Sequence, residues 1–121
     1  MKVRQTENNN ISYDGKIFTS ESNTPNGEVS EETLFYYHQD SNVLWANYYG
    51  GEIVRGYLIG TVSDDSSLDF YYQHINKGGE LRVGKCHSTP HMQEDGKLKL
   101  YENWKWLDKD QSVGSSIVIE V

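Results

Sequence analysis

The residues best suited to chemistry lie in the second half of the chain, around Glu102. This glutamate stands in the run KLKLYENWKWL, residues 97–107, whose other even-numbered positions are Leu98, Leu100, Trp104 and Trp106. Such alternation predicts a strand with one apolar face, so a carboxylate is placed within a stripe that should be buried. A buried carboxylate requires a basic or hydrogen-bonding partner, and it can orient a polar ligand or act as a general acid or base.

Basic side chains are predicted on the same face as Glu102. Counting residues across symmetric turns pairs Glu102 with Val83, places Lys85 diagonally from Glu102, and sets Arg55 opposite His74. Two interpretations stay open: a buried or half-solvated ion network with a structural role, and a ligand cavity with Tyr and Trp walls. For the cavity, the predicted ligand-binding residues are Tyr37, Arg55, Tyr57, Tyr72, His74, Lys85, Glu102 and Trp104.

Two other candidate sites are weaker. Cys86 and His87 look like a nucleophile beside a base, but neighbours on a strand point to opposite faces. His87 and His91 have the spacing of metal ligands on a helix, whereas Pro90 between them predicts a loop. We therefore predict no catalytic residue, no metal and no cofactor.

Short alternating runs rich in β-branched and aromatic residues predict strands along the chain, separated by turn-forming residues. The predicted strands are 13–21, 31–39, 42–49, 52–62, 67–75, 80–88, 97–107 and 114–121. Turns this short impose antiparallel hairpins. We predict an all-β fold, a single eight-stranded antiparallel up-and-down meander closing into a small barrel, because closure removes exposed edges. An open curled antiparallel sheet is the alternative. Residues 12–121 would form this one domain, preceded by a flexible tail over 1–11.

The same counting predicts which residues face inward and which face outward. The predicted inner face includes Phe35, Leu44, Tyr48, Ile53, Ile59, Phe70, Leu81, Val83, Leu100, Trp106, Ile117 and Ile119. The glycines Gly56, Gly60 and Gly84 are interpreted as places where strands bend to close the barrel. The outer face of the second to fourth strands is apolar, which favours a homodimer through Leu34, Tyr36, Trp45, Val54 and Leu58. The segment 13–18 folding over this face is the alternative.

Composition limits the partners and the compartment. The 121 residues carry a formal charge of −7, which disfavours nucleic acid and anionic membrane surfaces, because both attract basic proteins. One cysteine excludes an internal disulfide and fits a reducing compartment. The N-terminus has no apolar signal-peptide core, and no apolar run reaches the length of a membrane helix. The predicted location is cytoplasmic.

From Ile11 onward the chain resembles a group of short bacterial proteins of unknown role that often carry the label N-acetylglutamate synthase. The likeness lies in SNTPNGEVSEETLFYYHQ, YYGGEIVRGYLIGTV, and GGELRVGKCHSTP followed by KLKLYENWKW. The overall pattern also resembles lipocalin- and avidin-type barrels in architecture. Acetyltransferases of the labelled class bind the acetyl-CoA pyrophosphate on a Gln/Arg-x-x-Gly-x-Gly/Ala turn that opens a helix. The nearest match here, QEDGKL at 93–98, ends in Leu and leads into a predicted strand.

The leading prediction is a non-catalytic barrel that binds a small, partly aromatic or anionic ligand in an interior carrying Arg55, His74, Lys85 and Glu102. The first alternative is a protein-interaction module with a filled barrel. The second is an enzyme that uses Glu102 as acid or base, with Arg55 or Lys85 binding an anion. A cavity of about 300 Å³ or more would favour the ligand, and a packed interior would favour the module.

Overall fold

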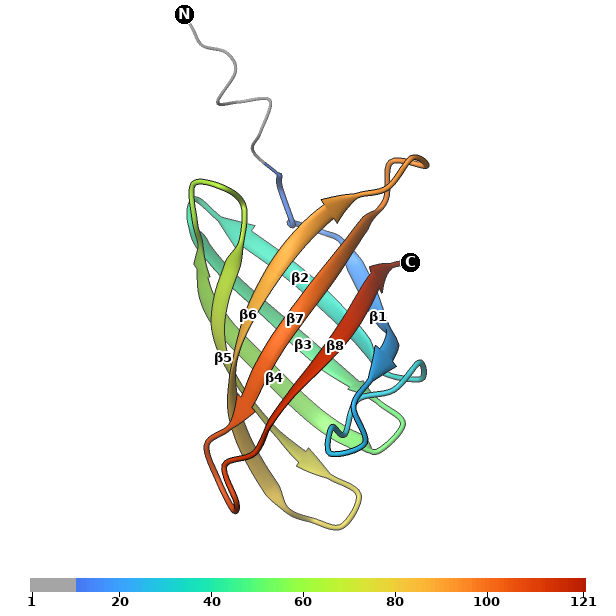
Figure 1. Ribbon diagram of the computed structural model, residues 1–121, viewed down its shortest axis with the longest axis vertical. Coiled ribbons are helices and arrows are strands. Elements are labelled where there is room, and N and C mark those ends of the chain that lie inside the picture. Colours follow the sequence, from blue (N-terminus) through green and yellow to red (C-terminus); the bar gives the residue numbers. More distant parts are fainter. Residues whose placement is uncertain (1–10) are drawn as a thin grey trace, which may run out of the picture.

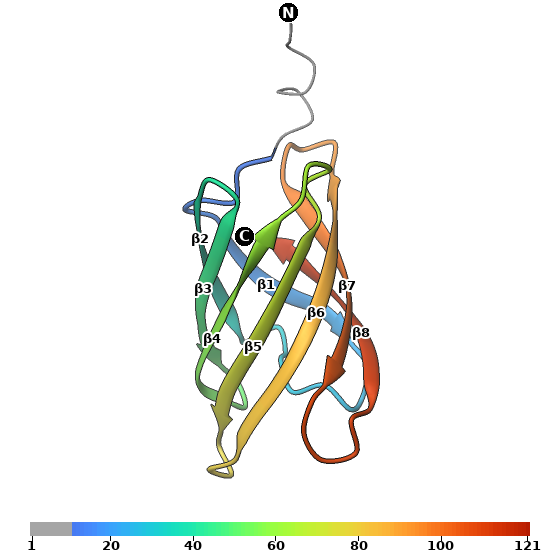
Figure 2. The ribbon, with the colours of Figure 1, turned by 90° about the vertical axis from the view of Figure 1, so that its left-hand side faces the viewer.

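The computed structural model describes residues 11–121 and shows eight antiparallel strands closed into a barrel (Figures 1 and 2). The strands are β1 (Ile17–Asn23), β2 (Leu34–Asp40), β3 (Val43–Gly50), β4 (Ile53–Val62), β5 (Leu68–Asn76), β6 (Leu81–Met92), β7 (Leu98–Trp106) and β8 (Val113–Glu120). Each strand pairs with its neighbours in sequence, and β1 pairs with β8. The predicted barrel is confirmed, and the open-sheet alternative is wrong, because the pairing of Phe18 with Glu120 closes the sheet.

The two ends of the barrel differ in their connections. The turns β2–β3, β4–β5 and β6–β7 lie at the upper end of the barrel in Figure 1. The other end carries the turns β3–β4, β5–β6 and β7–β8 and the longest connection, between β1 and β2, which runs from residue 24 to residue 33. Turn formers TPNG near its start fit this assignment as a loop.

The largest differences from the predicted strand boundaries are at the start of β1 and at the end of β6, and β2 begins at Leu34 instead of residue 31. β1 begins at Ile17, because Tyr13 leaves the sheet and enters the end of the barrel. β6 continues to Met92, through the stretch predicted as a turn. Its pairing with β5 ends at Ser88, so one side of the strand has no ladder partner at Pro90, and a residue without an N–H is tolerated there.

The inward faces of β2, β3, β5 and β7 are those predicted. Each tyrosine doublet places one ring inside, namely Tyr37, Tyr48 and Tyr72, and one ring outside. The outer rings of Tyr36 and Tyr49 stack with their centroids 5.6 Å apart. The fully buried side chains include Tyr13, Phe18, Tyr37, Leu44, Tyr48, Leu58, Leu68, Leu98, Leu100 and Val118. They form one continuous core along the barrel axis.

The inward faces predicted for β4, β6 and β8 are wrong. Local irregularities of the backbone reverse the side chains that follow them. A β-bulge at Val54 separates the pairing of Ile53 with Asn76 from that of Arg55 with Ile75, and a bulge reverses every later side chain of the strand. In β6, Ile75 pairs with Leu81, so the turn holds an odd number of residues instead of an even one. The residues turned outward against prediction are Arg55, Tyr57, Ile59, Leu81, Val83, Lys85, His87, Ile117 and Ile119, while Leu58 is turned inward.

Candidate functional site

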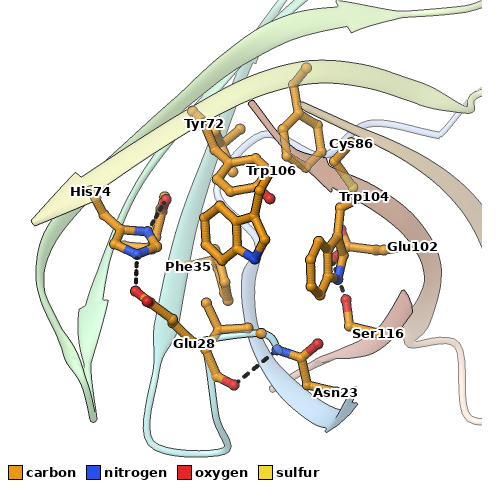
Figure 3. A pocket seen from close by; sticks show the side chains of 15 residues that line it. Asn23, Glu28, Phe35, Tyr72, His74, Cys86, Glu102, Trp104, Trp106 and Ser116 are labelled. Atoms are coloured by element: carbon orange, nitrogen blue, oxygen red, sulfur yellow. Dashed lines mark hydrogen bonds and ion pairs between the residues drawn. The ribbon is translucent and has the colours of Figure 1, made fainter. Parts of the chain in front are cut away.

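A cavity of about 50 Å³ lies inside the barrel, toward the end carrying the β1–β2 loop (Figure 3). Its walls are mainly aromatic: Phe35, Tyr48, Phe70, Tyr72, Trp104 and Trp106. The polar side chains that line it are Asn23, Glu28, His74, Cys86, Glu102 and Ser116. An apolar wall with a few convergent polar groups is the usual composition of a small-molecule site.

Glu102 lies between the two residues that oppose it on the neighbouring strands. Ser88 on β6 and Ser116 on β8 are its register partners, and their hydroxyls donate to the carboxylate at 2.7 and 3.1 Å. Burial raises the pKa of Glu102 to about 6, and the two serine hydrogen bonds lower it only in part. The predicted pairing with Lys85 or Arg55 is wrong, because both side chains lie on the outer face.

The β1–β2 loop is attached to the barrel through Glu28. One carboxylate oxygen of Glu28 lies 2.8 Å from His74 Nε2, the other accepts from Arg82 at 2.6 Å, and the Asn76 amide donates to both. Burial alone would raise the pKa of Glu28, but the bonds from His74, Asn76 and Arg82 bring it below its ordinary value. A residue from the loop therefore closes the cavity at this end with partly buried, charge-assisted hydrogen bonds.

His74 connects this closure to side chains of β3 and β7 inside the barrel. Its Nδ1 lies 2.9 Å from the hydroxyl of Tyr48, and its ring meets that of Trp106 edge to face. Burial lowers the pKa of His74, and Glu28 counteracts this only in part, so the neutral ring is favoured near pH 7. Since a carboxylate can only accept, the neutral ring donates from Nε2 to Glu28 and accepts from Tyr48 at Nδ1.

Arg82 is a buried, positively charged side chain at this end of the barrel. It donates from Nε and Nη2 to both oxygens of Asp108 at 3.0 and 3.1 Å, in addition to its bond to Glu28. Its guanidinium carbon lies 3.8 Å from the centre of the Trp106 ring. The charge of Arg82 is thus balanced by two carboxylates, and its guanidinium also packs on the face of an aromatic ring.

The other end of the barrel is closed by Tyr13. This side chain is completely buried, its hydroxyl donates to the carbonyl of Ser66 at 2.6 Å, and its ring contacts Tyr37. The segment preceding β1 therefore fills the barrel end instead of covering the outer sheet face. Ile11, assigned to the tail, donates its N–H to Ser66, and residues 1–10 of that tail lie outside the described residues.

The structure brings part of the predicted site together. Tyr72, His74, Glu102 and Trp104 line the cavity. Tyr37 is buried in the core beside the cavity without lining it, and it packs on Phe18. The inward placement predicted for the three remaining members is wrong, because the Val54 bulge and the odd-numbered β5–β6 turn direct them outward: Arg55, Tyr57 and Lys85.

Sequence reasoning missed the cavity residues Asn23, Glu28, Cys86 and Ser116 and the nearby Arg82 and Ser88. Glu28 lies in a loop with no periodicity to indicate its direction. The serines carry no hydropathy signal, and only the correct register would have placed them beside Glu102. Cys86 is buried inside, whereas His87 is exposed and 2.7 Å from Asp69, so the two are not partners, as predicted from strand geometry.

The cavity volume is well below the roughly 300 Å³ expected of an open ligand site. A cavity needs a volume of about 10–15 Å³ to hold one water molecule, so this cavity has space for a few water-sized groups. The structure is therefore a closed form whose interior is largely filled by side chains.

These features define a class: a small closed meander barrel whose interior has aromatic walls and a short set of polar groups. The chain matches the avidin-like protein family over residues 11–121 and belongs to that family. A search of the curated proteins found no match. The N-acetylglutamate synthase label has no support from the family match or the site. Within residues 11–121, no helix has the length and apolar character needed to cross a membrane.

Proposed function

We propose that the protein is a non-catalytic binder of a small ligand, which enters the barrel at the end closed by the β1–β2 loop. The observation that carries this proposal is the aromatic cavity with Glu102 in its wall and a loop residue, Glu28, across its mouth. Membership of the avidin-like family supports it, since the barrel is of a ligand-binding architecture. The proposed binding residues are now Tyr72, His74, Glu102 and Trp104, with Asn23 and Ser116 added.

The small volume requires that the ligand displace the loop or place only a small group inside. Glu28 is held by side-chain contacts to His74, Asn76 and Arg82, so its release would widen the mouth without breaking the strand ladders. Such loop displacement is a common way to admit ligands into closed sites.

Native mass spectrometry of the protein purified from its own host tests the proposal. A retained small molecule, absent after denaturation and lost in Tyr72→Ala but kept in Tyr71→Ala, would support it. These neighbours on β5 make a matched pair, because one ring lines the cavity and the other is exposed. An empty wild-type protein, or equal loss in both variants, would contradict an interior site.

A second candidate function is an interaction module that acts through its outer face, and the small cavity favours it. Apolar and aromatic side chains are exposed on neighbouring strands, among them Val43, Tyr49, Val54, Tyr57, Ile59 and Tyr71. Trp45 stacks on His38 in the same region. The homodimer predicted through Leu34, Tyr36, Trp45 and Val54 stays a proposal, without Leu58, which is buried inside.

A further inference from the structure

The electrostatic character of the cavity follows from which charged groups reach it. The charged side chains in its lining are the carboxylates of Glu28 and Glu102. Glu28 is neutralised by Arg82 and bonded by His74. Glu102 has no basic partner among the described residues, and its two hydrogen-bond donors are uncharged serines. A buried carboxylate without a counter-charge is costly, and it favours an incoming cation.

The groups around Glu102 cannot supply that charge. The titratable side chains facing it are Tyr37 from β2, Tyr48 from β3, Tyr72 from β5 and Cys86 from β6. Burial raises the pKa of each of them, so all stay protonated and neutral near pH 7. The buried guanidinium of Arg82 is paired with Glu28 and Asp108.

A second polar atom in the same cavity wall also lacks a donor. Asn23 Oδ1 is buried and accepts no hydrogen bond from the described residues, although the amide nitrogen of Asn23 donates to the carbonyl of Val29. Figure 3 places Asn23 at the loop end of the cavity, near Ser116 and Trp104. Buried oxygens without a donor are rare in folded proteins, so this atom is available to accept an N–H or O–H from a bound molecule.

The remaining walls suit a positive charge as well. Trp104, Trp106, Phe35 and Tyr72 present ring surfaces to the cavity, and aromatic rings attract cations through the negative potential of their faces. A carboxylate with free acceptor capacity, an unsatisfied amide oxygen and aromatic walls together describe a receptor for a cationic N–H donor.

We propose that the ligand of this cavity carries a cationic nitrogen, an ammonium or guanidinium group, which lies against Glu102 between the aromatic side chains. This inference builds on the ligand-binding function proposed above and fixes the chemical class of the group that enters. It replaces the anionic ligand expected from the sequence, because Arg55 and Lys85, which would have bound an anion, are on the outer face. The cavity of about 50 Å³ has room for such a head group.

Three planar molecules of the same shape and four heavy atoms make a direct test: guanidinium, urea and acetate. Titration of each at low millimolar concentration, followed by the NMR signals of the Trp104 and Trp106 indole N–H groups, gives three dissociation constants. Guanidinium should bind at least about tenfold more tightly than urea or acetate, because charge-assisted hydrogen bonds to a buried carboxylate are the strong ones. This comparison needs only the wild-type protein.

Glu102→Gln then identifies the carboxylate. It preserves the shape, removes the charge and exchanges one acceptor oxygen for an NH2 donor. It should weaken guanidinium binding about tenfold or more, while Glu94→Gln, the same change at an exposed loop position, should leave it unchanged. Equal guanidinium binding in Glu102→Gln, or acetate or urea binding as tightly as guanidinium at the same tryptophans, would overturn the cationic class but leave interior binding intact. No binding by any of the three also overturns it, and native mass spectrometry then decides the proposed function separately.

Discussion

The ring of Tyr72 covers Gly84, the residue directly opposite it on the neighbouring strand. A Cβ atom at position 84 would lie 2.2 Å from the phenol carbon and oxygen of Tyr72 and 2.8 Å from the carbonyl of Lys105. Gly56 and Gly114 stand in the same relationship to Tyr48 and Trp104. These glycines therefore make room for the inward aromatic rings that form the cavity walls.

Gly84→Ala should destabilise the barrel by about 1–3 kcal/mol, because the added methyl group forces Tyr72 from its position in a packed interior. Urea unfolding followed by circular dichroism measures this loss. Gly78→Ala is the matched control, since a Cβ at position 78 would meet only Asn76 Oδ1 at an ordinary 3.4 Å. Equal stabilities of the two variants would show that position 84 has space for a methyl group.

Glu102→Gln should change the pH dependence of stability. The carboxyl titrates near pH 6 in the folded chain and near its ordinary 4.5 when unfolded. The folded state therefore binds this proton more tightly, and the contribution of Glu102 to stability falls as pH rises between those values. The shift corresponds to about 2 kcal/mol.

The free energy of unfolding of Glu102→Gln, relative to wild type, should accordingly increase by about 2 kcal/mol from pH 4 to pH 8. Denaturant titrations at several pH values measure the difference. Glu94→Gln provides the control. A difference between Glu102→Gln and wild type that stays constant with pH would mean that the pKa of Glu102 is the same in the folded and the unfolded chain, as for a solvated carboxyl, and a difference that falls with pH would mean pairing with a base.

Glu28→Ala should loosen the β1–β2 loop and expose the cavity, because His74, Asn76 and Arg82 lose their common acceptor. Cys86 lines the cavity and is the only cysteine, so the rate of its reaction with a thiol reagent reports access to the interior. We expect labelling to accelerate about tenfold or more, as the open form gains population. Glu31→Ala, at an exposed position of the same loop, should label at the wild-type rate. Unchanged labelling in Glu28→Ala would exclude Glu28 as the closure.

Trp45→Glu tests the outer face. If this face mediates a homodimer, sedimentation at micromolar concentration should give twice the monomer mass for wild type and the monomer mass for Trp45→Glu, with an unchanged β-rich circular dichroism spectrum. Asn103→Glu, an exposed position on β7, should remain dimeric. A monomeric wild-type protein would remove the dimer from consideration.

The sequence predicted the fold because its information is mostly local: alternation, turn residues and short connections permit only a hairpin meander. The sequence placed Glu102 inside correctly because two errors cancelled. The side-chain directions predicted for β4 and for β6 were reversed, and in each case an opposite error at the following turn restored the correct direction in the next strand. The bulge at Val54 and the odd-numbered turn before Leu81 depend on backbone geometry. No hydropathy pattern indicates either of them, so Arg55 and Lys85 were placed on the wrong face.

The candidate site was less predictable than the fold. Glu102, His74, Tyr72 and Trp104 were found because they interrupt or complete an apolar stripe. Glu28 contributes from a loop, and its direction depends on tertiary contacts with His74 and Arg82. The partners of Glu102 are two serines, residue types whose burial depends on register alone. Charge complementarity suggested basic partners instead.

The closure of the barrel along β1 has a consequence for local unfolding. In the strand ladder, β1 pairs with β2 only from Ile17 to Thr19, and its pairing with β8 is interrupted by a bulge between Ser20 and Ser22. By comparison, β4 pairs with β5 without interruption from Arg55 to Val62. The sheet therefore has a seam along β1, where the fewest backbone hydrogen bonds must break for amides to exchange with solvent. Strand β1 ends at Asn23 and is followed by the loop that closes the cavity. The part of the sheet that opens most easily therefore lies next to the proposed entrance of the cavity.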